Sequence, residues 1–172
     1  MNPVRARLVY ESDLGKALAY AIAEGLGPRA TVRVVSAADA ARLPEPAVDL
    51  LVVGGPTHAF GAAHTYGLAR AALGARPIPA AEGEETAGVR DWLAQAAPAP
   101  LAARAAAFGT KLATTSRLPG STAHTIGRRL RTLGYELATT PADFLVTCTP
   151  PTLLSGELRR AWHWGAHLAA TV

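Results

Sequence analysis

Apolar runs separated by stretches of helical spacing organise most of the chain. Alternating or continuous apolar character predicts strands over residues 4–10, 31–35, 49–55 and 104–110. Residues 135–137 and 144–148 have the same character and predict two pieces of a fifth strand, interrupted by the sequence Thr-Thr-Pro-Ala-Asp. The run over 49–55 is apolar after its first residue, which is typical of a strand covered on both faces.

Helical spacing of apolar residues predicts helices over residues 15–26, 61–73, 86–96, 121–133 and 154–170. Gly27-Pro28 ends the first helix, while Ser121 caps the fourth and Gly134 ends it. The residues expected to face the core are Leu18, Ile22 and Leu26 in the first helix, Val89, Trp92 and Leu93 in the third, and Trp162 in the last. Loops are indicated around Pro44 and Pro46, over 76–88, and over 111–120.

Strands that alternate with helices predict an α/β fold, with a parallel sheet and helices on both faces. In such sheets a ligand lies beyond the carboxyl ends of the strands, at the point where the strand order reverses. The sequence therefore directs attention to the loops over 11–16, 56–66 and 111–120.

Length and composition favour one folded domain over residues 1–172. Hydrophobic residues make up 49% of the chain and charged residues 17%, which excludes a disordered protein. The single cysteine, Cys148, excludes a disulfide framework and a multi-cysteine metal site within one chain, and is expected to be a small buried apolar residue. No apolar run is long enough for a membrane span, and the first 13 residues lack a signal peptide's apolar stretch. We therefore expect a cytoplasmic protein with no membrane partner.

The charge is basic but dispersed. The net charge is +4, and 15 of the 17 basic residues are arginine. The densest groups, Arg128, Arg129 and Arg131, then Arg159 and Arg160, fit the exposed faces of two helices. No zinc-finger, basic-zipper or RNA-binding motif accompanies them, so nucleic acid is not expected as a partner.

Several motifs, in a fixed order, carry a family resemblance. LVYES (8–12), VVGGPTHAFG (52–61) and RRLRTLGYEL (128–137) resemble flavodoxin-like proteins of GC-rich bacteria, and TAGVRDWL (86–93), AAFGTK (106–111) and SGELRRAWHWGAHLA (155–169) fit the same pattern. The resemblance covers nearly the whole chain. It implies a doubly wound five-stranded parallel sheet of order 2-1-3-4-5, with FMN at the carboxyl edge for electron transfer or small-molecule reduction.

The resemblance also implies a set of cofactor-binding residues: Ser12, Gly15, Lys16, Pro56, Thr57, His58, Phe60, Gly61, Thr110 and Thr114. The family usually has Ser/Thr-x-x-Gly-Asn-Thr where this chain has Ser-Asp-Leu-Gly-Lys-Ala, so the Asn-Thr pair is missing. Asp13 adds a carboxylate that repels a phosphate dianion, and Lys16 is the cation that would offset it. The family commonly has Asp at the position of Gly109, and residues 111–120 hold no aromatic residue to stack on a flavin. These departures predict a weakened or lost FMN phosphate site.

Two further hypotheses remain open. The cleft can serve a flavin-independent enzyme or small-molecule-binding protein, with Asp13, His58, His64 and Tyr66 as acid–base or positioning groups. Against this, Ser12 is equally a helix cap and Asp13 a charge that complements the helix dipole. The chain can also be a non-catalytic partner-binding module that dimerises through its helices. The expected partners are thus a small molecule in the cleft, a redox protein, or a second copy. His163 and His167 lie four apart without a third ligand, so no metal site is predicted.

Overall fold

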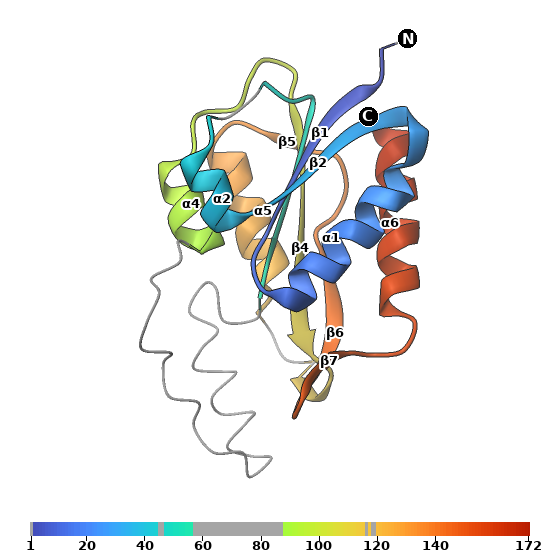
Figure 1. The fold of residues 1–172 in the computed structure, drawn as a ribbon. Coiled ribbons are helices and arrows are strands. Elements are labelled where there is room, and N and C mark those ends of the chain that lie inside the picture. Colours follow the sequence, from blue (N-terminus) through green and yellow to red (C-terminus); the bar gives the residue numbers. More distant parts are fainter. Residues whose placement is uncertain (1, 45–46, 57–87, 116, 118–119) are drawn as a thin grey trace.

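The computed structural model describes residues 2–44, 47–56, 88–115, 117 and 120–172 (Figure 1). The strands are β1 Val4–Tyr10, β2 Ala30–Ser36, β3 Leu50–Gly55, β4 Arg104–Leu112, β5 Glu136–Leu137, β6 Ala142–Cys148 and β7 Pro151–Leu153. The α-helices are α1 Asp13–Leu26, α2 Ala37–Arg42, α4 Val89–Gln95, α5 Thr122–Thr132 and α6 Glu157–Thr171, with 3-10 turns at Gly27–Arg29 and Ala113–Thr115. The helix predicted over 61–73, and the loop predicted over 76–88 except for its last residue, lie outside the described residues.

The sheet confirms the predicted α/β class. Its order is β2-β1-β3-β4-β6-β7, and β5 also pairs with β4. Every pairing is parallel except the one between β6 and β7. The predicted order 2-1-3-4-5 is recovered when β5 and β6 are taken as the two pieces of the fifth strand.

The predicted count of five strands needs correction, because the described residues form seven. β5 pairs with the start of β4 at Arg104 and Ala105, whereas β6 pairs with its later part from Phe108 to Leu112. The predicted interruption is therefore real, and it divides one strand position into two elements. β7 is an antiparallel addition that the sequence analysis missed, since only three residues extend the sheet there.

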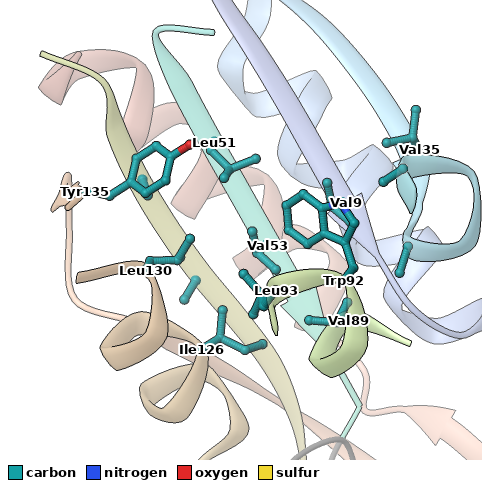
Figure 2. Close-up of a cluster of buried hydrophobic side chains, with 14 of the residues drawn as sticks. Val9, Val35, Leu51, Val53, Val89, Trp92, Leu93, Ile126, Leu130 and Tyr135 are labelled. Carbon is teal, nitrogen blue, oxygen red and sulfur yellow. The ribbon is translucent and has the colours of Figure 1, made fainter. Parts of the chain in front are cut away.

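Helices cover both faces of the sheet (Figure 1). α1 and α6 lie on one face, and α2, α4 and α5 lie on the other. Adjacent residues of β1 serve the two sides, since Leu8 belongs to the α1/α6 core and Val9 to the opposite core. Figure 2 shows the second core, where the predicted inward residues Val89, Trp92 and Leu93 are almost fully buried.

α1 and α6 approach each other unusually closely. A Cβ atom on Gly25 would lie 2.0 Å from the carbonyl oxygen of Trp162, and one on Gly165 would lie 2.2 Å from that of Ile22. Two glycines, one on each helix, therefore allow backbone-to-backbone contact. The predicted core face of α1 is confirmed, because Leu18, Ile22 and Leu26 have almost no exposed area.

The tryptophan predicted to pack on the sheet is the wrong one. Trp162 is 42% exposed, whereas Trp164 meets Phe108 and Phe144 edge to face, with all ring centroids 6.4 Å apart. The two positions are two residues apart and point to different sides of α6. Within the described part of the chain, no helix is both long and apolar enough to cross a membrane.

Candidate functional site

The topology places the switch point of the sheet between the carboxyl ends of β1 and β3, and we call this point, where a doubly wound sheet binds its ligand, the crevice. From β1 the chain crosses to β2 on one side, and from β3 it proceeds to β4 and β6 on the other. The strand order thus reverses between β1 and β3, which are neighbours in the sheet. The end of β1 continues through Glu11 into the start of α1, and β3 ends in Gly54, Gly55 and Pro56, all buried.

Ser12 is the N-cap of α1. Its side-chain oxygen accepts a hydrogen bond from the Gly15 amide at 3.2 Å, and its carbonyl accepts one from the Lys16 amide at 2.9 Å. The first turn of a helix leaves further amides without an acceptor inside the helix, here those of Ser12, Asp13 and Leu14. The helix-cap interpretation of Ser12 is therefore correct, and the remaining amides form a polar, positive end beside the crevice.

The backbone of Ser12 is strained. Its φ is 72° and its ψ is 163°, a region that is essentially reserved for glycine. Holding a residue with a side chain there costs about 1–3 kcal/mol, and such strain collects at ligand sites. Ser12 is also exposed as a residue.

The charges around this helix end are mixed. Asp13 lies in the first turn of α1, and both Asp13 and Lys16 are exposed. Across the described residues, no ion pair joins either side chain to another group. Lys16 therefore does not offset the charge of Asp13 through an ion pair between the two side chains.

Glu11 is a site residue that the sequence analysis missed. Its carboxylate accepts a hydrogen bond from the Val89 amide at 2.9 Å, across 78 positions of sequence. It therefore caps α4 from the end of β1, and Gly88 leaves room for it, since a Cβ there would lie 3.0 Å from a carboxylate oxygen. Its place directly after β1 was the available signal, but its partner was not visible in the local sequence.

The third predicted loop begins later than expected. Lys111 and Leu112 continue β4, and Leu112 is buried, so the polar loop starts after them. Thr110 is 6% exposed inside the strand, while Thr114 is exposed in the turn that follows. Both lie one strand further from the crevice than Pro56.

The neighbours of position 109 explain why a glycine stands there. A Cβ on Gly109 would lie 3.0 Å from both the Ala123 amide nitrogen and a carboxylate oxygen of Asp143. Asp143 itself accepts a hydrogen bond from that Ala123 amide at 3.4 Å. A carboxylate at 109 would therefore meet a second carboxylate, and Asp143 already holds the start of α5.

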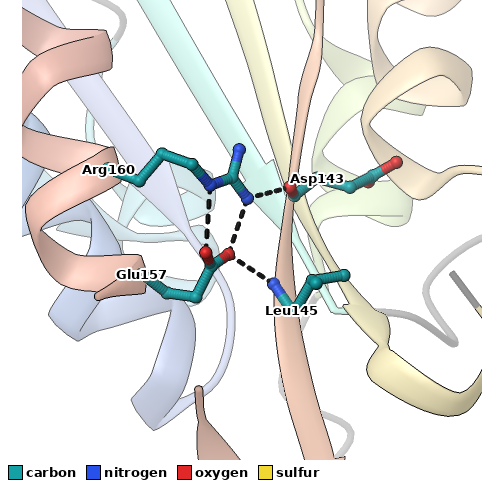
Figure 3. Close-up of polar contacts among 4 residues, drawn as sticks. All are labelled: Asp143, Leu145, Glu157 and Arg160. Atoms are coloured by element: carbon teal, nitrogen blue, oxygen red, sulfur yellow. Dashed lines mark hydrogen bonds and ion pairs between the residues drawn. The ribbon is translucent and has the colours of Figure 1, made fainter. Parts of the chain in front are cut away.

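The start of α6 is anchored by an ion pair between the buried Glu157 and the half-exposed Arg160 (Figure 3). Glu157 accepts hydrogen bonds from the Leu145 amide and from Arg160, both at 2.6 Å, and Arg160 also donates to the Asp143 carbonyl. The Arg160 guanidinium lies 4.4 Å above the Phe144 ring. Burial tends to raise the pKa of Glu157, but the hydrogen bonds from Arg160 and Leu145 outweigh it and hold that pKa below its usual value.

The structure thus brings some predicted site residues together and is silent on others. Ser12, Asp13, Gly15 and Lys16 lie at the start of α1, next to the strand that ends in Pro56. The remaining predicted residues, Thr57, His58, Phe60, Gly61, His64 and Tyr66, lie outside the described residues. His163 and His167 are exposed on α6, and the described residues contain no cluster of metal ligands.

Solved flavodoxin structures match nearly the whole chain. Oxidised flavodoxin 2 from Bacillus cereus is 16% identical, with a TM-score of 0.61, 98% of this chain covered and 99% of that one. A flavodoxin from the domain Archaea is 19% identical, with a TM-score of 0.56 and 96% of both chains covered. The flavodoxin of Streptococcus pneumonia TIGR4 is 15% identical, with a TM-score of 0.56 and 98% and 99% covered.

These matches establish the fold, which is flavodoxin-like. At such identities they establish no more than that. No family model and no curated protein matches the chain.

Proposed function

We propose that this protein binds FMN in the crevice between β1 and β3 and uses it in the cytoplasm for electron transfer or for reduction of a small molecule. The observation that carries the proposal is the start of α1. Ser12 is exposed and its backbone is strained, and among the described residues the amides of Ser12, Asp13 and Leu14 find no acceptor at the point where a doubly wound sheet binds its ligand. The flavodoxin-like fold gives the same point its expected ligand.

The residues at the start of α1 fit the phosphate group of FMN. The hydroxyl of Ser12 and the amides of Ser12, Asp13 and Leu14 would hold phosphate oxygens, with Gly15 keeping the turn free of a side chain. Pro56, with Thr57, His58, Phe60 and Gly61, would border the ring, and Thr110 and Thr114 its far side. Bound FMN would supply one- or two-electron transfer through its ring.

Asp13 makes this phosphate site weaker than a helix end without an added carboxylate. Two unit charges about 4 Å apart repel by about 1–4 kcal/mol at effective dielectric constants between 80 and 20. Lys16 is exposed and makes no fixed contact with Asp13, so the repulsion is only partly offset. We therefore expect FMN to bind at micromolar rather than nanomolar concentration.

The first test is the absorbance spectrum of the purified protein, followed by separate titrations with FMN and with riboflavin. Riboflavin has the same ring and no phosphate, so the ratio of the two dissociation constants isolates the phosphate site. We expect FMN to bind more tightly by about tenfold or less, equivalent to roughly 1.4 kcal/mol. Absence of binding for both flavins would refute the proposal, and equal binding would refute its phosphate site.

A second candidate function is favoured by the same carboxylate. An exposed Asp13 beside a helix N-terminus suits a ligand that brings a proton donor or a positive group, with no flavin involved. Its acid–base or positioning groups would be Asp13, His58, His64 and Tyr66. This candidate predicts a colourless protein whose activity on a small molecule falls when Asp13 or His64 is replaced by Ala.

A further inference from the structure

α5 differs in charge from every other described α-helix. It carries Arg128, Arg129 and Arg131 and no carboxylate, whereas α1, α2, α4 and α6 each contain at least one acidic and one basic residue. Its opposite side is apolar and fixed, because Ala123, Ile126 and Leu130 are completely buried in the core. The helix therefore presents its charged side to solvent in a defined orientation.

Three basic side chains form one stripe. His124, Arg128 and Arg131 follow the spacing i, i+4, i+7, so they lie above one another on the same side of the helix, and all three are exposed. Arg128 donates a hydrogen bond to Thr125 at 3.3 Å, which holds its guanidinium along the helix. Arg129 lies on the flank of the stripe and is exposed as well.

Within the part of the chain that the structure describes, no carboxylate forms an ion pair with an arginine of this stripe. The ion pairs recorded among the described residues involve Arg5, Arg104 and Arg160, and none involves an arginine of α5. The two nearest acidic residues on adjoining strands are engaged elsewhere. Glu136 pairs with Arg104 at 3.6 Å, and Asp143 accepts from the Ala123 amide.

We propose that the exposed side of α5, formed by His124, Arg128, Arg129 and Arg131, is the docking surface for a protein partner with an acidic surface. The helix begins at the carboxyl edge of the sheet, where Thr122 and Ala123 lie against Gly109. The start of α5 therefore lies beside β4, one strand beyond the crevice. The role of this docking, electron exchange with the partner, rests on the proposed function. The binding of the partner to α5 does not itself require FMN.

Charge selects this partner over two others. A second copy of the chain docking through α5 would bring arginines against arginines, because a two-fold interface pairs each patch with itself. A single-stranded nucleic acid is disfavoured, because the 11 residues of α5 include no Phe, Tyr or Trp on which bases could stack. An acidic protein surface needs only a short complementary stripe.

The test is binding of a fluorescent poly-L-glutamate peptide of about 20 residues, measured by anisotropy at low salt. We expect the double variant R128A/R131A to weaken binding about tenfold. The control R33A/R42A removes two other exposed arginines, one on β2 and one on α2, and is expected to change binding less than about twofold. The variant R128K/R131K keeps the charge and is expected to retain binding to within about threefold.

Three outcomes would overturn the inference. The first is equal weakening in R128A/R131A and R33A/R42A, which would mean that net charge alone attracts the peptide. The others are no peptide binding at low salt, and tighter, α5-dependent binding of a DNA duplex of equal charge.

FMN titration of the same variants separates the two proposals. R128A/R131A is expected to leave the FMN dissociation constant unchanged. Peptide binding through α5 without any FMN binding would remove the proposed function and keep the docking surface.

Discussion

α1 and α6 are neighbours of nearly equal length, with 14 and 15 residues, yet they begin in opposite ways. The first residue of α6, Glu157, is buried and fastened to β6 through the Leu145 amide, with Arg160 closing the ion pair. The hydrogen bonds of Ser12 at the start of α1 stay within its own turn, and Asp13 and Lys16 are exposed.

The difference separates a structural helix end from one available to a ligand. The starts of α4, α5 and α6 each take a carboxylate from another part of the chain or give one to it: Glu11, Asp143 and Glu157. Among the described residues, the starts of α1 and α2 exchange no such carboxylate with another element, and α1 is the one that follows β1, a strand at the point where the order reverses. The carboxylates at the starts of α4, α5 and α6 are thus used in contacts between elements, whereas in the described part of the chain the first amides of α1 remain for another acceptor.

The largest expected effect on stability comes from the contact between α1 and α6. Gly25→Ala would place a methyl group 2.0 Å from the Trp162 carbonyl oxygen, so the two helices must move apart. We expect the free energy of unfolding to fall by about 3 kcal/mol, although alanine is the better helix former. Chemical denaturation measures this loss. Glu24→Ala, one position away and exposed, is the control and should change stability by less than about 0.5 kcal/mol.

The next effect tests the fastened end of α6. Glu157→Gln removes the charge that faces Arg160, and we expect a loss of about 2 kcal/mol at neutral pH. Because the folded-state pKa of Glu157 lies below its ordinary value of 4.5, its contribution is present above that pH and disappears as the pH falls through the folded pKa. Stabilities of wild type and variant should therefore converge in acid. A constant difference from pH 7 down to strong acid would contradict the ion-pair explanation, and Arg159→Gln, exposed and outside the network, serves as control.

Both helix bodies could be predicted from sequence, and so could the cap of α1 by Ser12, but the contacts that fasten the start of α6 could not. Helical spacing, as in Leu18, Ile22 and Leu26, and apolar runs, as in β1 and β3, are visible over short stretches of sequence. These patterns therefore predicted the elements and their order. Glu11 and Glu157 have partners 78 and 12 residues away, and nothing local reports such distances.

The elements that were missed are short. α2 has six residues and β7 has three, which gives too few positions for a period to emerge. In the structure Ser36 caps α2, because its hydroxyl accepts a hydrogen bond from the Asp39 amide and donates one to the Asp39 carboxylate. Trp162 and Trp164 both fit a helix with an apolar side, and only the contact with Phe108 and Phe144 decides between them.

A smaller effect tests the strain at the open end of α1. Ser12→Gly removes the hydroxyl but relieves the backbone, whereas Ser12→Ala removes the hydroxyl and keeps the strain. We expect Ser12→Ala to lose about 1 kcal/mol of stability, and Ser12→Gly to match or exceed wild type. Thermal unfolding of both variants measures the difference. If the glycine variant is the less stable of the two, Ser12 is not strained.

The smallest expected effect is also the one that separates ligand binding from helix stability. Asp13→Asn removes a carboxylate that favours the N-terminal end of α1, so stability should fall by about 0.5 kcal/mol. The same change removes a repulsion toward phosphate, so FMN should bind about fivefold more tightly while riboflavin binding stays the same. Glu24→Gln makes the same chemical change near the other end of α1 and should alter neither flavin. Because stability and FMN affinity move in opposite directions, a general loosening of the helix cannot imitate the result. An unchanged ratio of FMN to riboflavin affinity would mean that the phosphate does not lie at this helix end.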